Sequence, residues 1–158
     1  MPDQKPRCTK SELNALAVFA LDYYQQGKVA QAERMYKRLV IAEDSVYSFY
    51  GYAGLGAIAL NQDPPRLDDA CTHLTIAADL NPKDTSVHTN LGEVFLRQKK
   101  FTEAASELQK AVDLDPETRD RGANRARALL TALKALQDEA EKPSATPQAE
   151  AGESSATT

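Results

Sequence analysis

The side chains suited to metal binding or nucleophilic catalysis are few in this chain: two histidines, His73 and His88, and two cysteines, Cys8 and Cys71. A metal site takes three or four converging ligands. Cys71 and His73 are two residues apart, and such a pair on a helix faces different sides. Two cysteines are also too few for a disulfide framework. We therefore predict no catalytic site, no metal site and no cofactor, and we expect a binding protein rather than an enzyme.

Three glycines, Gly51, Gly54 and Gly56, resemble a phosphate-binding loop at first sight. A phosphate cradle places its glycines in the turn between a strand and a helix. Here they stand among apolar residues that continue a helix, so we place them inside a helix and at its packing contact. Phosphate binding is therefore not expected.

A repeated pattern organises the chain. The best copy runs from Thr85 to Thr118, with small, aromatic and helix-starting residues at fixed offsets: Leu91-Gly92, Phe95, Ala104, Leu108, Ala111 and Asp115-Pro116. A second copy begins at Phe49 and a degenerate first copy at Leu13. The equivalent positions Ala20, Gly56 and Gly92 recur every 36 residues. This spacing is close to the roughly 34 residues of the tetratricopeptide helix–turn–helix repeat.

The repeat predicts an all-α solenoid of three tetratricopeptide hairpins, in units at about 13–46, 49–84 and 85–118. We expect helices at about 11–26 and 29–43, 46–62 and 66–80, and 84–98 and 101–114. Thr9-Lys10-Ser11-Glu12 has the form of a capping box that opens the first helix. Gly27 suits the end of that helix because glycine readily takes a positive φ. Residues 1–10 are expected to be a flexible N-terminus.

A C-terminal capping helix is expected at 117–142, which completes a domain over 11–142. Asp115-Pro116-Glu117 would open it with an N-cap, a proline in the first turn and an acidic residue. An apolar stripe would cover the last hairpin, and we interpret the arginines at 119–127 as its solvated face, with an acidic partner as the minority alternative. Residues 143–158 have no large apolar side chain, so we predict a disordered tail.

Such solenoids usually bind another polypeptide on their concave face, which the first helix of each hairpin lines. The candidate binding residues are the inward positions of the three first helices: Leu21, Tyr24, Tyr50, Ala53, Ala57, Leu60, Asn90, Glu93 and Leu96. In the first two units they are mostly small and apolar, and tyrosine adds a hydroxyl to its apolar area. For Leu21 and Leu60, helix packing is an equally good interpretation.

One known binding mode is excluded by the residues present. Tetratricopeptide domains that grip the C-terminal carboxylate of heat-shock chaperones need Lys, Asn and Arg at defined inward positions. This chain has other residues there: Ala17, Leu21, Gly54, Ser86 and Asn90. We therefore expect the concave face to prefer an extended segment with spaced aliphatic side chains.

The bulk properties narrow the partners further. A formal net charge of −4 gives no reason to expect nucleic-acid binding. The longest apolar run, Ala15 to Leu21, is far shorter than a bilayer-spanning helix, so we expect no membrane insertion. The low cysteine count favours a reducing, cytoplasmic setting. We expect a monomer or a weak homodimer.

The chain also resembles the class II translocator chaperones of bacterial type III secretion, over about residues 11–142. The likeness is carried by Ala20 to Lys28 with Ala32, by Tyr52 to Ala57 and by Leu129 to Lys134. Members are small, acidic and cytoplasmic, with three tetratricopeptide units and a C-terminal helix. The insertion at Pro64-Pro65 and the Ser/Thr/Ala-rich tail depart from the family pattern.

The resemblance implies that the concave face holds an extended, proline-containing segment of a secreted client. That role would fall on the matching positions Leu21, Tyr24, Tyr50, Ala57 and Leu60. The alternative is a general tetratricopeptide scaffold or adaptor in the assembly of a multiprotein complex.

Overall fold

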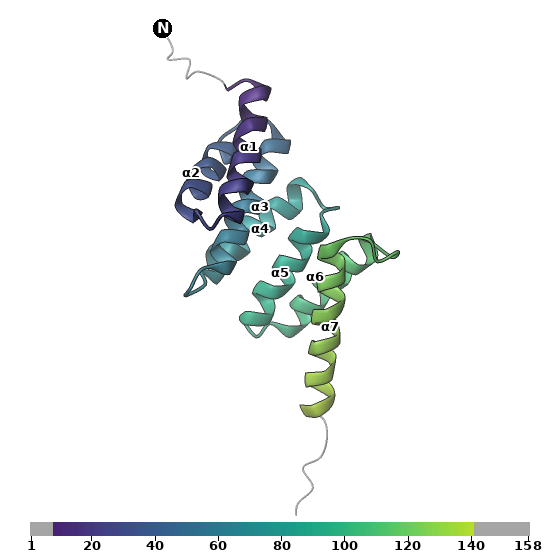
Figure 1. Cartoon of the computed structure of the whole chain (residues 1–158). Coiled ribbons are helices and arrows are strands. Elements are labelled where there is room, and N and C mark those ends of the chain that lie inside the picture. The colour runs from purple at the N-terminus through teal and green to yellow at the C-terminus, as the bar shows by residue number, and fades with distance from the viewer. Residues whose placement is uncertain (1–7, 141–158) are drawn as a thin grey trace, which may run out of the picture.

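The computed structural model describes residues 8–140, and over this range the chain is all-α, as predicted (Figure 1). Seven helices follow one another in it: α1 (Lys10–Gln25), α2 (Val29–Val40), α3 (Ser45–Asn61), α4 (Leu67–Leu80), α5 (Thr85–Arg97), α6 (Phe101–Leu114) and α7 (Arg121–Ala140). The first six form three hairpins, and α7 packs against both helices of the last one.

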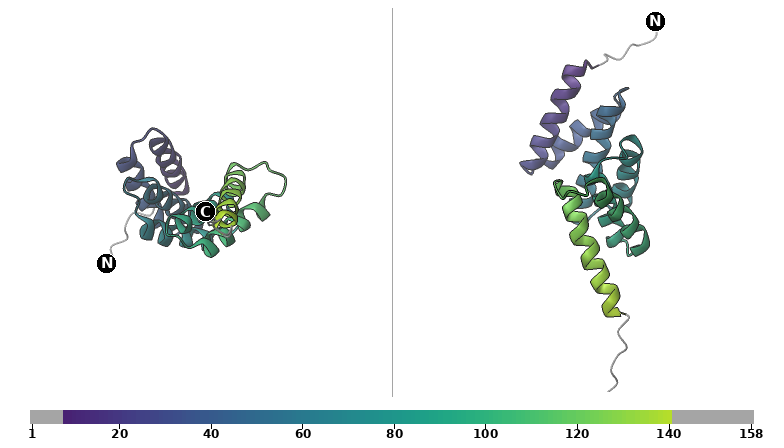
Figure 2. Two further views of the ribbon diagram at one scale, coloured as in Figure 1. Left: turned by 90° about the horizontal axis from the view of Figure 1, so that it is seen from below. Right: turned by 90° about the vertical axis from the view of Figure 1, so that its right-hand side faces the viewer.

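The hairpins stack into a curved array. Helices α1, α3, α5 and α7 each contact the next of the four, whereas within the described residues no Cα atoms of α2, α4 and α6 come within 8 Å of one another. Neighbours are therefore closer on the side of the first helices, which becomes the concave face. In the end-on view of Figure 2, α1 and α7 rise on either side of a floor that contains α3 and α5.

Glycines bring the two helices of a hairpin together, as the repeat register predicts. A Cβ added at Gly92 would lie 2.5 Å from Leu108 Cγ, and one at Gly56 would lie 2.5 Å from Leu74 Cγ. Both distances are shorter than any ordinary contact between carbon atoms. The two glycines therefore allow α5 to approach α6, and α3 to approach α4, closely enough to bury both leucines.

The hydrophobic clusters extend across the boundaries between units. Leu55 and Ile58 of α3 belong to the cluster that also holds Leu39 of the first hairpin. Val94 of α5 likewise belongs to the cluster of the second hairpin, and Ala126 of α7 to that of the third. Each unit thus completes its core with the first helix of the next, which is how solenoid repeats gain stability.

The N-terminal helix has the predicted ends. The backbone N–H of Glu12 donates to Thr9 Oγ1 at 3.3 Å, and the backbone N–H of Thr9 donates to Glu12 Oε2 at 2.7 Å, which completes the capping box. Gly27 follows the helix with φ +74°. Pro64 and Pro65 lie in the connection between α3 and α4, because neither helix includes them.

The start of the last helix is a correction. We expected it at 117, but α7 begins at Arg121. Residues 115–120 form a turn in which Thr118 has φ +60°, and the helix is capped by Asp120, which accepts from the backbone N–H of Ala123 at 3.0 Å. The hydroxyl of Thr85 on α5 also donates to Asp120. This contact joins two distant parts of the sequence, so the residues next to Asp120 do not predict it. The predicted tail 143–158 and most of the predicted flexible N-terminus lie outside the described residues.

Candidate functional site

Most of the predicted binding residues remain accessible to solvent. Leu21 on α1 is 50% exposed and Tyr50 on α3 is 47% exposed. The other accessible members are partly buried: Tyr24, Ala53, Ala57, Asn90 and Leu96. The accessible members on α1 and α3 are therefore uncharged and largely apolar. We call these residues, Leu21, Tyr24, Tyr50, Ala53 and Ala57, the apolar strip.

Leu60 is a correction to the predicted site. Its side chain has 0% exposure and belongs to the core cluster that joins α3, α4 and α5. A buried side chain of this kind cannot contact a bound peptide directly. Of the two interpretations that the sequence left open, helix packing holds for Leu60. Its backbone carbonyl still faces the site, because it accepts from Arg97 Nη1 at 3.1 Å.

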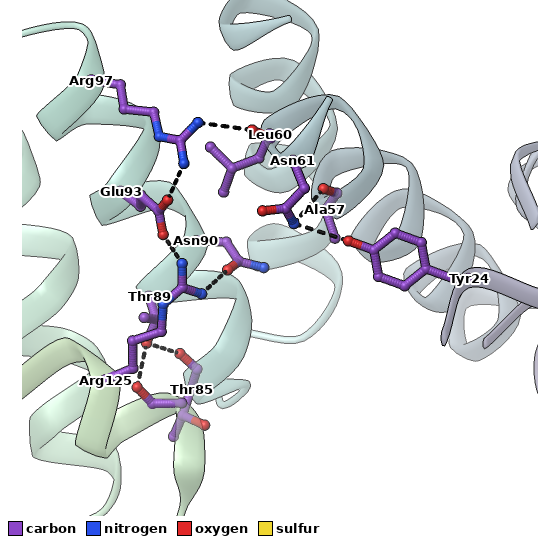
Figure 3. A network of polar contacts seen from close by, with 11 residues as sticks. Tyr24, Ala57, Leu60, Asn61, Thr85, Thr89, Asn90, Glu93, Arg97 and Arg125 are labelled. Atoms are coloured by element: carbon purple, nitrogen blue, oxygen red, sulfur yellow. Dashed lines mark hydrogen bonds and ion pairs between the residues drawn. The ribbon is translucent and has the colours of Figure 1, made fainter. Parts of the chain in front are cut away.

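A hydrogen bond joins the first two units across the apolar strip (Figure 3). The side-chain amide of Asn61 donates to the Tyr24 hydroxyl at 2.9 Å and to the carbonyl of Ala57 at 2.9 Å. The tyrosine oxygen thus acts as acceptor and keeps its own proton for another partner. A hydroxyl proton and an amide oxygen are therefore present beside apolar surface, where an extended chain needs partners for its backbone groups.

The α5 and α7 side of the concave face is charged instead. Glu93, a predicted binding residue, is buried. It accepts from Arg97 Nη2 at 2.6 Å and forms a short ion pair with Arg125 (Figure 3). Arg125 also donates to the side-chain oxygen of Asn90 at 3.2 Å. We call Glu93, Arg97 and Arg125 the arginine pair with its glutamate. Nearby, the hydroxyl of buried Thr89 donates to the carbonyls of Thr85 and Gly122 and ties α5 to α7.

This charged group revises the interpretation of the C-terminal arginines. Arg125 contacts the concave face, and Arg127 donates to the backbone carbonyl of Asp115. Arg119, in an exposed pair with Glu117, and Arg121 are exposed, as expected of a solvated face. Two arginines of this segment are therefore structural contacts within the domain.

The predicted site did not include Asn61, Arg97 or Arg125. The repeat could have identified the first two. Asn61 and Arg97 are 36 residues apart, the spacing that also separates Gly56 and Gly92, and so both occupy the same inward position of their units. The repeat could not have identified Arg125, because the direction of its side chain depends on the residue at which α7 begins. That start is set by the contact between Thr85 and Asp120 across two elements.

A separate pocket of about 670 Å³ opens between α4, α5 and α6. Apolar residues such as Leu91 and Phe95 and charged residues such as Asp79 and Lys110 line it together. His88 Nδ1 lies 2.8 Å from Glu107 Oε2, and Nε2 lies 3.0 Å from the carbonyl oxygen of Pro82. Because both neighbours are acceptors, the hydrogen bond to Glu107 above all raises the pKa of His88 and lowers that of Glu107. His88 is thus buried as its repeat position predicts, and it carries an ion pair as well.

Over residues 8–140, no three His, Cys, Asp or Glu residues are grouped so that they could hold a metal ion. None of the helices in that range has the length and apolar character needed to cross a bilayer.

A family model described as a tetratricopeptide repeat matches residues 66–117, which span α4 to α6. No curated protein matches the sequence. The helical arrangement described above agrees with this match and is the tetratricopeptide fold that the sequence predicted.

Several solved structures share the whole arrangement. The type III secretion translocator chaperone SycD of Yersinia enterocolitica has a TM-score of 0.72 at 23% identity, over 83% of this chain and 89% of that one. PcrH from Pseudomonas aeruginosa has a TM-score of 0.69 at 21% identity, over 85% and 99%. PcrH in complex with the chaperone binding region of PopD has a TM-score of 0.70 at 23% identity, over 83% and 97%. The fold of this chain is the fold of these chaperones.

Proposed function

We propose that this protein is a cytoplasmic chaperone that holds an extended apolar segment of a secreted protein client on its concave face. The observation that carries the proposal is the apolar strip. Its residues on α1 and α3 remain accessible to solvent, whereas the core residues of the same helices are buried. PcrH, which shares the fold, is known in complex with the chaperone binding region of PopD. That example supports a client-binding role for this chain.

The chemistry of the strip suits an extended chain. Leu21 and Tyr50 offer half-exposed apolar area, whose burial against client side chains is favourable. The Tyr24 hydroxyl and the Asn61 amide oxygen supply a donor and an acceptor for the client backbone. An exposed apolar segment of a client would otherwise aggregate, so covering it would keep the client soluble.

The proposed compartment and the non-catalytic role have their own support. Cys8 and Cys71 are both free thiols, which suits a reducing cytoplasm. The concave face carries anchors for a polypeptide, and the ion pairs on it hold α5 and α7 together. We therefore propose binding rather than catalysis.

We also propose that any self-association is weak and uses α1. Phe19 is 53% exposed, and it borders a hollow of about 250 Å³ lined by Glu12, Ala15, Leu16 and Arg38. Sedimentation over a range of protein concentrations would test this proposal. A dimer that dissociates on dilution and is lost in Phe19→Glu supports it, and a dimer that persists in that variant contradicts it.

A scaffold or adaptor is the second candidate function, and the pocket between α4, α5 and α6 favours it. That pocket lies away from the apolar strip, and Leu114 at its edge is exposed. A folded partner docking there would make this protein an assembly adaptor.

A selection experiment distinguishes the two functions. A phage-displayed library of random peptides is selected on the wild-type protein and on Tyr24→Glu/Tyr50→Glu. We expect the wild type to enrich extended sequences with spaced aliphatic residues and the double variant to lose this enrichment while its helical circular dichroism is unchanged. Equal selections on both proteins would contradict the chaperone proposal. Phe101→Glu, an exposed apolar site on α6, is the matched control and should select like the wild type.

A further inference from the structure

We propose that the segment held on the concave face carries an Asp or Glu side chain next to its apolar stretch, and that Arg97 and Arg125 bind this carboxylate. The inference rests on the proposed function, which it deepens by naming the chemistry of the client. It is carried by the geometry of the arginine pair with its glutamate (Figure 3).

The two guanidinium groups are held in place and are still accessible. The side chains of Arg97 and Arg125 are 41% and 48% exposed, while that of Glu93 is 12% exposed. Glu93 accepts from both arginines, so it positions them across the α5–α7 junction. A guanidinium has five N–H donors, and the contacts with described residues use two on Arg97 and two on Arg125. Donors therefore remain for a ligand.

The local charge favours an anion. Two arginines face one carboxylate, so the arginine pair with its glutamate has an excess of one positive charge, although the whole chain has a net charge of −4. Guanidinium groups pair with carboxylates through two parallel hydrogen bonds, which adds geometric specificity.

The concave face thus has an uncharged part and a positively charged part. On the α1 and α3 side its residues are uncharged: the apolar strip and Asn61. On the α5 and α7 side it is positive. An extended client with aliphatic residues followed or preceded by one acidic residue would match both halves and could lie in only one direction. Charged contacts of this kind fix orientation and partner choice more than they add affinity.

The carboxylate belongs to a side chain and not to a chain end. The inward positions that grip a chain end in the heat-shock clamp hold other residues here: Ala17, Leu21, Gly54, Ser86 and Asn90. The client therefore contributes an internal acidic residue, in contrast to the C-terminal carboxylate that the heat-shock clamp grips.

The test uses the phage-displayed peptide library, whose peptides are fused at their C-termini and present no free carboxylate there. It is selected on the wild type and on Arg97→Gln/Arg125→Gln. We expect both proteins to enrich aliphatic residues, and the wild type alone to enrich Asp or Glu at one fixed offset from them. Arg119→Gln/Lys134→Gln, which removes the same charge outside the site, is the matched control and should select like the wild type.

A titration completes the test without depending on the folding of a variant. A peptide selected on the wild type is compared with the same peptide carrying Gln in place of its acidic residue. We expect the Gln peptide to bind the wild type about tenfold more weakly, and the two peptides to bind Arg97→Gln/Arg125→Gln equally. Aliphatic enrichment without an acidic preference, or equal binding of both peptides to the wild type, overturns this inference alone. Loss of aliphatic enrichment itself overturns the proposed function.

Discussion

The hydroxyl of Tyr24 on α1 accepts a hydrogen bond from the side-chain amide of Asn61 on α3, with 2.9 Å between the nitrogen and the oxygen. The same amide donates to the carbonyl of Ala57, so Asn61 is held by its own helix and can in turn hold the tyrosine. The bond fixes an aromatic side chain of the apolar strip across the boundary between two repeats. An ordered anchor loses less conformational entropy when a ligand binds.

Asn61→Ala therefore separates binding from stability. Asn61 is exposed, so losing its hydrogen bonds should lower the free energy of unfolding by no more than about 1 kcal/mol. Peptide affinity should fall about three- to tenfold, because Tyr24 is no longer held. Urea unfolding and a peptide titration measure the two effects. An unchanged affinity would mean that the Tyr24–Asn61 bond plays no part in binding.

Gly92→Ala should destabilise the protein, against the usual trend. Alanine inside a helix is normally favoured over glycine by about 0.5–1 kcal/mol. Here the new Cβ would meet Leu108 Cγ at 2.5 Å, and Gly92→Leu should cost more, about 1–3 kcal/mol or above. Urea unfolding followed by circular dichroism measures both variants. Ala132→Leu, at an exposed position of α7, is the control and should change stability little. A Gly92→Ala protein as stable as the wild type would show that the repeat register is wrong.

The ion pair of His88 and Glu107 should make stability depend on pH. The folded-state pKa of His88 lies above its ordinary value of 6.5, so its contribution is complete below that pH and is lost as the pH rises through the folded-state pKa. The folded-state pKa of Glu107 lies below 4.5, so its contribution is present above pH 4.5 and is lost as the pH falls through the folded-state value. The pair should therefore stabilise most between pH 4.5 and 6.5.

The measurement compares His88→Gln with the wild type by urea unfolding across this range and up to about pH 9. We expect the difference between the two proteins to be largest in the acidic window and to shrink toward alkaline pH. His73→Gln serves as a control of opposite sign, because burial lowers the pKa of His73, and its contribution is lost as the pH falls. A constant difference between His88→Gln and the wild type would contradict the ion-pair assignment.

Glu93→Gln should loosen the end of the solenoid. Glu93 is the acceptor that links Arg97 on α5 to Arg125 on α7. Both arginines are half exposed, so solvent screens the pairs and the loss of stability should be modest, about 1 kcal/mol. Amide hydrogen exchange should speed up in α7 and stay unchanged in α1 and α2. Uniform exchange across all helices would mean that Glu93 does not act on α7.

The repeat pattern predicted the fold because each local signal agreed with the stacked arrangement. Gly27 predicted the end of a helix, and Gly56 and Gly92 each predicted a close approach of two helices. The structure has all three features. The predicted site was less complete for a physical reason. Leu60 is buried by α5, and the start of α7 depends on Thr85 and Asp120. Both are contacts between units, and a pattern read within one unit does not contain them.

The central claim is that the concave face binds an extended apolar segment through the apolar strip. The most direct test is a fluorescence anisotropy titration of a labelled peptide selected on the wild type, against the wild type, Tyr24→Glu/Tyr50→Glu and Phe101→Glu. Each tyrosine anchor should contribute about 2 kcal/mol, so the double variant should bind roughly a thousandfold more weakly, while Phe101→Glu should bind like the wild type. A folded double variant that binds the peptide with wild-type affinity would contradict the account.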